Sequence, residues 1–174
     1  MNRKVVIVVL LAVLGLIFGL YYSVRTQGVP AYQNDGRVTI NRPKVVNNEV
    51  VLVPEDKNIP TTGDPVALTL QALFQDADEH STDRAIPKGT KLVKVTVKDS
   101  VAEIELSKEF LDLGKSGDSA ISAAQNSILK SLEQFPSIAK VTILVDGKVF
   151  DDGASGKWEN LTIRDEKPRK VPAK

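Results

Sequence analysis

Residues 91–106, KLVKVTVKDSVAEIEL, decide the fold, because apolar and polar side chains alternate on both sides of Asp99 and Ser100. A two-residue turn there pairs apolar side chains on one face of a hairpin: Val97 with Ala102, Val95 with Ile104, and Val93 with Leu106. The same register places Lys94 opposite Glu105 on the other face. Since one register satisfies both faces, the sequence predicts an antiparallel hairpin with one buried and one polar face.

Two helical patterns lie on either side of this hairpin. Residues 63–75 have apolar side chains at i, i+4, i+7 and i+8, with Asp64 in the N-cap position and Pro65 in the first helical position. The second pattern starts near Asp118, and Pro136 helps to end it. The apolar stripes are Val66, Leu70, Leu73 and Phe74 in the first helix, and Ile121, Ala124, Ile128, Leu132 and Phe135 in the second.

Three further segments are predicted to be strands. The run EVVLV, residues 49–53, is almost continuously apolar, as expected of a strand that is central or covered on both sides. KVTILV, residues 140–145, follows the second helix closely, and NLTI, residues 160–163, is expected to form a short last strand. The order β-α-β-β-α-β predicts an α+β fold with both helices on one face of a mainly antiparallel sheet.

Four short motifs occur in a set order around these elements. They are IPKGT at 86–90, ELS at 105–107, QFP at 134–136 and VDGK at 145–148. In their order and spacing they resemble the GerM-type (GerMN) domain of bacterial spore germination and sporulation proteins. This resemblance implies an envelope-anchored domain, similar to the ring-building domains of sporulation channel complexes and without known catalysis; this chain has a single copy of the domain, fewer than some relatives carry. The chain departs from the family in having Ser100 where the hairpin turn usually has glycine, and in lacking the cysteine of a lipoprotein.

The N-terminus is strongly apolar. Twenty residues from Val5 to Val24 carry no charge, and a helix of that length spans about 30 Å, the thickness of a bilayer's hydrocarbon core. Arg3 and Lys4 favour a cytoplasmic N-terminus. We therefore predict a single-pass anchor in the plasma membrane, with the rest of the chain extracytoplasmic. The alternative, a signal peptide removed after export, predicts the same compartment for the rest.

The predicted organisation has four parts. Residues 1–24 form the transmembrane anchor, 25–48 an extracytoplasmic linker, 49–164 the GerMN-like domain and 165–174 a charged tail. The linker is predicted because this segment shows no sustained hydrophobic period and contains several glycines and prolines. A short strand at RVTI, residues 37–40, is the one element expected within it.

Composition excludes several classes of function. The net charge is +1 and the basic residues are spread along the chain, which argues against a nucleic acid partner. The absence of cysteine excludes disulfides, thiolate metal sites and cysteine nucleophiles. The sequence predicts no cofactor.

His80, the only histidine, has two interpretations. With its neighbours it could form a Ser-His-Asp set or a carboxylate–histidine metal site. Those neighbours are Asp76, Asp78, Glu79, Ser81 and Asp83. The same composition is typical of a polar loop after a helix. Because no G-x-S-x-G motif or similar rigid mount is present, we favour the loop and predict that the protein is not an enzyme.

The segment DGKVFDDGASG, residues 146–156, resembles a calcium loop in composition only. Lys148 and Phe150 occupy the third and fifth positions, where an EF-hand loop requires oxygen ligands. Turns that use the positive φ of glycine explain the segment better. We therefore predict no metal site here.

Two functions remain open from the sequence. The first is a non-catalytic structural or interaction module of the cell envelope that assembles with itself or with other envelope proteins. The alternative is an extracytoplasmic domain that binds a small ligand or wall polymer through the loop before Trp158. Trp158 is expected to cover the core rather than to stack on a sugar. Lys94, Glu105 and Trp158 are the candidate partner-binding residues.

Overall fold

The computed structural model describes residues 32, 34–46, 49–75 and 86–163. The chain divides into two units, Met1–Ala31 and Tyr32–Lys174, and the description below concerns the second. The predicted anchor and charged tail lie outside the described residues. Of the helices within those residues, none is long and apolar enough to cross a membrane.

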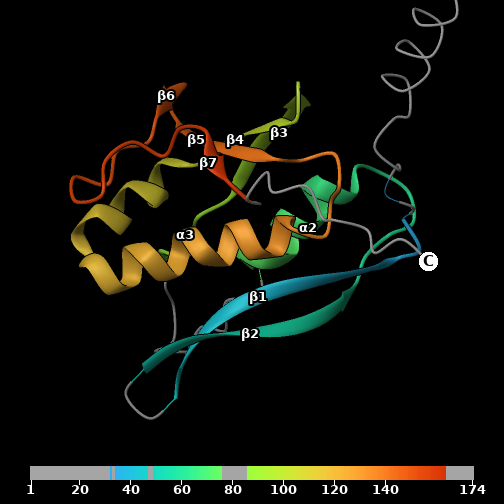
Figure 1. Ribbon diagram of the computed structural model, residues 1–174, viewed down its shortest axis with the longest axis horizontal. Helices are drawn as coiled ribbons and strands as arrows, with labels where there is room; N and C mark the ends of the chain where they lie inside the picture. Colours follow the sequence, from blue (N-terminus) through green and yellow to red (C-terminus); the bar gives the residue numbers. More distant parts are fainter. Residues whose placement is uncertain (1–31, 33, 47–48, 76–85, 164–174) are drawn as a thin grey trace, which may run out of the picture. The chain divides into compact units, whose positions relative to one another are not determined.

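The helices lie between two sheets (Figure 1). The elements are β1 (Arg37–Val46), β2 (Glu49–Asn58), α2 (Pro65–Gln75), β3 (Leu92–Lys98), β4 (Val101–Leu106), the 3-10 helix η1 (Lys108–Lys115), α3 (Asp118–Leu132), β5 (Lys140–Val145), β6 (Lys148–Val149) and β7 (Leu161–Thr162). Strands β1 and β2 form one sheet. The other has the order β3-β4-β5-β6, with β7 also paired to β5. The α+β class predicted from the sequence is confirmed.

The β3–β4 hairpin confirms most of the predicted register. Val95 lies opposite Ile104, and Lys94 lies opposite Glu105. The predicted pairing of Val93 with Leu106 is wrong, because a bulge between Leu92 and Lys94 leaves Val93 unpaired and 64% exposed. An extra residue in a strand reverses the side-chain alternation beyond it, so Leu92 rather than Val93 covers Leu106.

The turn of this hairpin has two residues, as predicted. Asp99 and Ser100 have φ values of 50° and 61°, the left-handed conformation that a tight hairpin turn requires at both positions. The carbonyl of Ser100 also accepts hydrogen bonds from the N–H groups of Ala139 and Lys140, at 2.8 and 3.1 Å. These bonds tie the turn to the start of β5, which pairs parallel to β4.

Both predicted helices are present with their predicted faces. The Asp64 carboxylate accepts a hydrogen bond from the N–H of Val66 at 2.9 Å and so caps α2. All the side chains of the two predicted apolar stripes are buried, including Phe135, which follows the end of α3. A core therefore forms between the helices and the inner face of the five-stranded sheet, where Ile104 and Ile143 are 0% exposed.

Strand β1 corrects the predicted linker. Residues 37–46 lie within the segment 25–48, yet they form a ten-residue strand paired with β2 along its length. Val38 and Ile40 are buried, so this strand belongs to the folded domain. The short strand predicted at residues 37–40 is only the first part of β1. Pro43 and the polar residues around it obscure the alternation of apolar and polar side chains in the rest of the strand.

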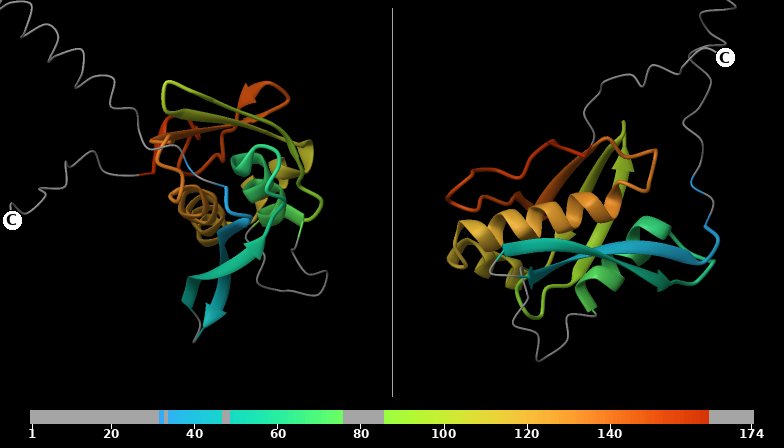
Figure 2. Two further views of the ribbon diagram at one scale, coloured as in Figure 1. Left: turned by 90° about the vertical axis from the view of Figure 1, so that its right-hand side faces the viewer. Right: turned by 60° about the horizontal axis from the view of Figure 1, so that its bottom comes forward.

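Strand β2 also differs from its prediction. It was expected to be central or covered on both sides, but in the described structure it pairs only with β1. Val50 and Val51 are 45% and 37% exposed. The helices are therefore covered by the five-stranded sheet on one side and by the β1–β2 hairpin on the other (Figure 2).

Candidate functional site

The structure separates the three candidate residues from the sequence. Lys94 and Glu105 lie opposite each other on the face of the five-stranded sheet that points away from the helices. Trp158 lies in the core and is 1% exposed. The three residues therefore do not form one site.

Glu105 has a structural contact. Its carboxylate accepts a hydrogen bond from the N–H of Gly147 at 2.9 Å. Gly147 lies in the turn between β5 and β6, where Asp146 and Gly147 have φ values of 51° and 70°. Glu105 thus links β4 to this turn, while Lys94 remains an exposed side chain beside it.

Trp158 is a core residue, as expected. Its ring packs edge-on against Phe110 and Phe150, with ring centroids 5.7 and 5.3 Å away. Its Nε1 donates a hydrogen bond to Asp152 Oδ2 at 2.7 Å. Because the indole is enclosed by these groups, it does not present a face on which a sugar ring could stack.

Asp152 organises the loop before Trp158. Its Oδ1 accepts hydrogen bonds from the N–H groups of Ala154, Ser155 and Gly156 at 2.8, 2.7 and 2.9 Å. Its Oδ2 accepts bonds from the Ser155 hydroxyl and from Trp158. Both oxygens of this 3%-exposed carboxylate are therefore occupied.

The charge state of Asp152 follows from these contacts. Burial by itself would raise its pKa, but hydrogen bonds from Ser155, Trp158 and the backbone N–H groups of Ala154 and Gly156 outweigh burial and hold the pKa well below its ordinary value. A carboxylate held ionised by five donors is poorly suited to move a proton near neutral pH.

The two alternative sites from the sequence have different outcomes. His80 and its carboxylate neighbours lie outside the described residues. In the loop from 146 to 156, the structure uses Asp152 to order the backbone. Within the described part of the chain, no group of three His, Cys, Asp or Glu side chains is arranged to hold a metal ion.

Sequence reasoning did not single out Asp152. Its only sequence signal is an Asp followed at short range by Ser155 and Gly156, a composition typical of a side-chain-capped turn. That pattern indicates a turn but not burial. The contact with Trp158 depends on the strands that enclose the loop.

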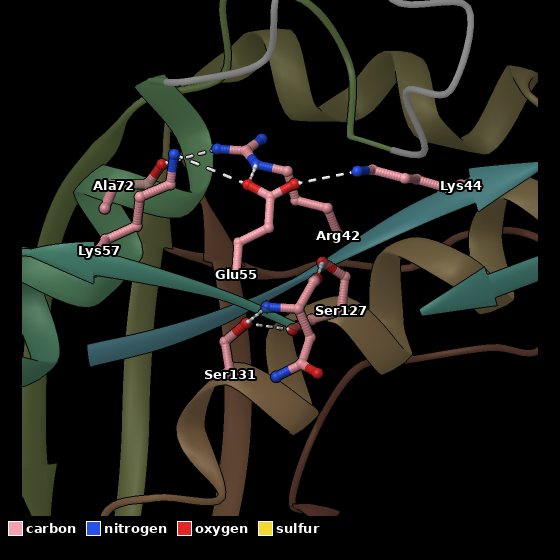
Figure 3. A network of polar contacts seen from close by, with 8 residues as sticks. Arg42, Lys44, Glu55, Lys57, Ala72, Ser127 and Ser131 are labelled. Carbon is pink, nitrogen blue, oxygen red and sulfur yellow. Dashed lines mark hydrogen bonds and ion pairs between the residues drawn. The ribbon is translucent and has the colours of Figure 1, made fainter. Parts of the chain in front are cut away.

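Polar side chains of α3 and of the residues after it form hydrogen bonds with the edge of β1 that does not pair with β2. The Gln134 amide accepts a hydrogen bond from the Thr39 N–H at 3.1 Å and donates one to the Thr39 carbonyl at 2.8 Å. Ser131 Oγ accepts a bond from the Asn41 N–H at 2.9 Å, and Ser127 Oγ donates to the Asn41 carbonyl at 2.5 Å. Figure 3 shows Ser127 and Ser131 beside β1, and together with Gln134 they take the place of a neighbouring strand.

A second polar network joins the hairpin to α2 (Figure 3). Arg42 Nε lies 3.2 Å from Glu55 Oε2, and Arg42 Nη2 donates to the Ala72 carbonyl at 3.0 Å. Lys44 and Lys57 also approach the Glu55 carboxylate, at 3.4 and 3.6 Å. Ala72 is in the last turn of α2, where carbonyls lack helical partners and cations are favoured. The network therefore stabilises the attachment of the hairpin to α2.

The remaining candidates for function are surface side chains. The large apolar side chains exposed in the described structure are Val50 and Val51 on β2, Val93 and Val97 on β3, and Leu111 in η1. Four of the five lie on strands that have one unpaired edge, where a protein partner could add a strand. The candidate site is therefore a pair of strand edges, β2 and β3.

Comparison with known proteins agrees with this fold. A family model described as Germane, sporulation and spore germination, matches residues 20–151, about three quarters of the chain. The first GerMN domain of the sporulation protein GerM from Bacillus subtilis is similar in structure, with a TM-score of 0.54 and 20% identity over 72% of this chain and 97% of that one.

A second solved structure gives a similar result. The tandem GerMN domains of the same Bacillus subtilis protein match with a TM-score of 0.53 and 22% identity, over 71% of this chain and 43% of that one. None of the curated proteins matches the sequence. The structural similarities concern the fold, and the family-model match covers most of the described domain. The chain therefore belongs to the Germane family of sporulation and spore germination domains, and its folded part is a GerMN domain.

Proposed function

We propose that this chain is a membrane-anchored interaction module of the bacterial cell envelope that acts through protein contacts rather than catalysis, in sporulation or germination. The family supports the process. The apolar segment from Val5 to Val24 supports the anchor, with the GerMN domain on the outer side of the plasma membrane.

One observation carries the non-catalytic part of this proposal. The polar side chains that form hydrogen-bond networks in the described domain have structural partners: Asp152 orders its loop, Gln134 bonds to β1, and Arg42 bonds to α2. The exposed apolar side chains, by contrast, lie on the edges of β2 and β3. Contacts made through such edges are weak in solution, and tethering in a membrane raises the effective concentration of the contacting domains.

Two experiments test the proposal in the full-length chain. The anchor predicts that the protein stays with membranes in high salt and is released by detergent, with an intact N-terminus by mass spectrometry. A mature chain that begins after Val24 would contradict the anchor.

Assembly is tested by site-specific crosslinkers at Val51, Lys94 and Glu105 in cells at native expression. Multimers or complexes with envelope proteins are expected from at least one of these positions. Monomers alone from all three, and from the exposed helix surfaces, would contradict the interaction function.

A further inference from the structure

Among the residues that the structure describes, none pairs with the outer edge of strand β2, and the backbone geometry of this edge follows from the contacts of β1. Thr39 and Asn41 use their N–H and C=O groups to bond side chains of α3 and its following turn. Those groups therefore point away from β2. In an antiparallel pair the opposite residue then also points its N–H and C=O outward. The register places Leu52 opposite Pro43 and Val50 opposite Val45, so Val50 and Leu52 present their backbone groups to the free edge of β2.

The other described strand edges are protected. On β1, the α3 side chains occupy the edge at Thr39 and Asn41, and Pro43 beyond them has no N–H to offer. On β3, the bulge at Val93 interrupts the edge, and Lys94 and Lys98 carry charges beside it. Strands β6 and β7 have only two residues each.

The edge of β2 carries apolar side chains instead. Val50 and Val51 are exposed, and no hydrogen bond from the described residues reaches the outward groups of Val50 or Leu52. The interruption comes only at Pro54, whose outward position lacks an N–H. An added strand can therefore pair with residues 50–53, and pairing that extends to Pro54 loses a bond.

We infer that β2 pairs antiparallel with β2 of a second copy of this chain, about a two-fold axis at Val51. This inference rests on the proposed function, because it names one partner and one surface for the proposed interaction module. In this register Val50 of one copy lies opposite Leu52 of the other, and each pair exchanges two backbone bonds, about four in all. Pro54 stays outside the pairing, whereas a two-fold axis at Leu52 or Val53 brings it in.

The side chains in this register are compatible with self-association. Val51 meets its own symmetry mate, and Val50 meets Leu52, so the contacts are apolar on both faces of the shared sheet. Lys44, the neighbour of Val51 on β1, already has its ammonium group 3.4 Å from the Glu55 carboxylate, which reduces repulsion between the two copies. Because an isologous contact closes on itself, the expected product is a dimer.

The chain has no cysteine, so an introduced cysteine cannot form a disulfide within its own chain, and a disulfide-linked product of twice the chain mass identifies pairing with a second copy. Across an antiparallel pair that is not hydrogen-bonded, Cα atoms are about 4.5 Å apart, within disulfide range. Full-length Val51→Cys in membranes should therefore give a disulfide-linked dimer under mild oxidation. Val93→Cys is the matched control, since Val93 is the more exposed valine and lies on a protected edge. It should give several-fold less dimer.

A second substitution tests the backbone pairing itself. Leu52→Pro in the Val51→Cys chain removes an outward N–H that the hairpin does not use, and should abolish the dimer while circular dichroism shows a folded domain. If that variant unfolds, Val50→Lys replaces it, because Val50 is 45% exposed. Equal dimer from Val51→Cys and Val93→Cys, or a dimer that survives both substitutions in a folded chain, overturns the inference. If Val51→Cys stays monomeric while crosslinkers at Lys94 or Glu105 capture partners, this inference fails and the proposed function stands.

Discussion

The two sheets of this domain are attached to the helices by different kinds of contact. The five-stranded sheet presents an apolar face in which Ile104 and Ile143 are fully buried against the helices. The β1–β2 sheet buries Val38 and Ile40, but is otherwise held by the side chains of Gln134, Ser127 and Ser131 and by the Arg42 network. Apolar attachment gives most of the stability of a domain, whereas polar attachment fixes a position in space. The difference predicts that substitutions at the two sheets have unequal effects.

The largest effect is expected in the core between the five-stranded sheet and the helices, to which Ile104 on β4 and Leu132 on α3 both belong. Ile104→Ala or Leu132→Ala removes methyl groups from fully enclosed positions and leaves a cavity, so each should lower the free energy of unfolding by about 2–5 kcal/mol. Urea denaturation followed by circular dichroism measures this. Val93→Ala is the control, since its side chain is 64% exposed, and it should change stability by less than about 0.5 kcal/mol. A small loss at Ile104 would show that the core is not centred on this sheet.

The same difference explains what could be predicted from the sequence. Apolar attachment appears in the sequence as a hydrophobic period, so the β3–β4 hairpin and both helix faces followed from the pattern of residues. The burial of Trp158 was expected from its residue type. The bulge at Val93 did not follow from the pattern, because one extra residue leaves the composition of the strand unchanged.

Attachment of a strand to a helix through polar side chains leaves no hydrophobic period in the sequence. Ser127, Ser131 and Gln134 look like surface residues of a helix and its end, yet they bond to a strand about 90 positions earlier in the chain. Without that contact, residues 37–46 appeared to be a linker. Of the candidate site, the sequence identified Lys94 and Glu105 on a sheet face, but not the edge of β2, because a free edge depends on which strands pair.

The next effect concerns Asp152, whose loop lies against the five-stranded sheet. Asp152→Asn replaces a buried acceptor of five hydrogen bonds with a neutral group that must present an NH2 to some of the donors. The free energy of unfolding should fall by about 1–3 kcal/mol. Asp151→Asn is the matched control, because Asp151 is exposed and accepts one recorded bond, from the Gly153 N–H. Equal losses for the two variants would contradict the structural role of Asp152.

Asp152 should also give the domain a dependence on pH. Its pKa is lower in the folded chain than in the unfolded chain, so the folded state binds this proton less readily. The stabilisation is fully present above the unfolded-state pKa, about 3.9, and is lost as the pH falls towards the lower folded-state pKa. Thermal unfolding should therefore shift more steeply with acid in the wild type than in Asp152→Asn. Parallel curves for the two proteins would argue against a lowered pKa.

A smaller and more local effect is expected at the β1–β2 sheet. Gln134→Ala leaves the Thr39 N–H and C=O without their partners at a partly buried position, which should cost about 1 kcal/mol. Amide hydrogen exchange should accelerate at Thr39 while β4 and β5 remain protected. Gln71→Ala on the exposed face of α2 is the control and should leave the exchange of Thr39 unchanged. Acceleration throughout the five-stranded sheet would show that the two sheets unfold as one unit.

The smallest effect should be a gain of stability, at the turn of the β3–β4 hairpin. Ser100 has φ of 61°, a conformation that disfavours residues with a Cβ and that glycine adopts freely. Ser100→Gly should relieve this cost, but it also gives the unfolded chain more freedom, so the net gain should be about 0.5 kcal/mol. The Ser100 carbonyl, which accepts from Ala139 and Lys140, is retained in the variant. Ser100→Ala, which keeps the Cβ, should not share the gain. Denaturant midpoints for the two variants and the wild type measure the difference, and a loss of stability in Ser100→Gly would show that the serine side chain itself supports the turn.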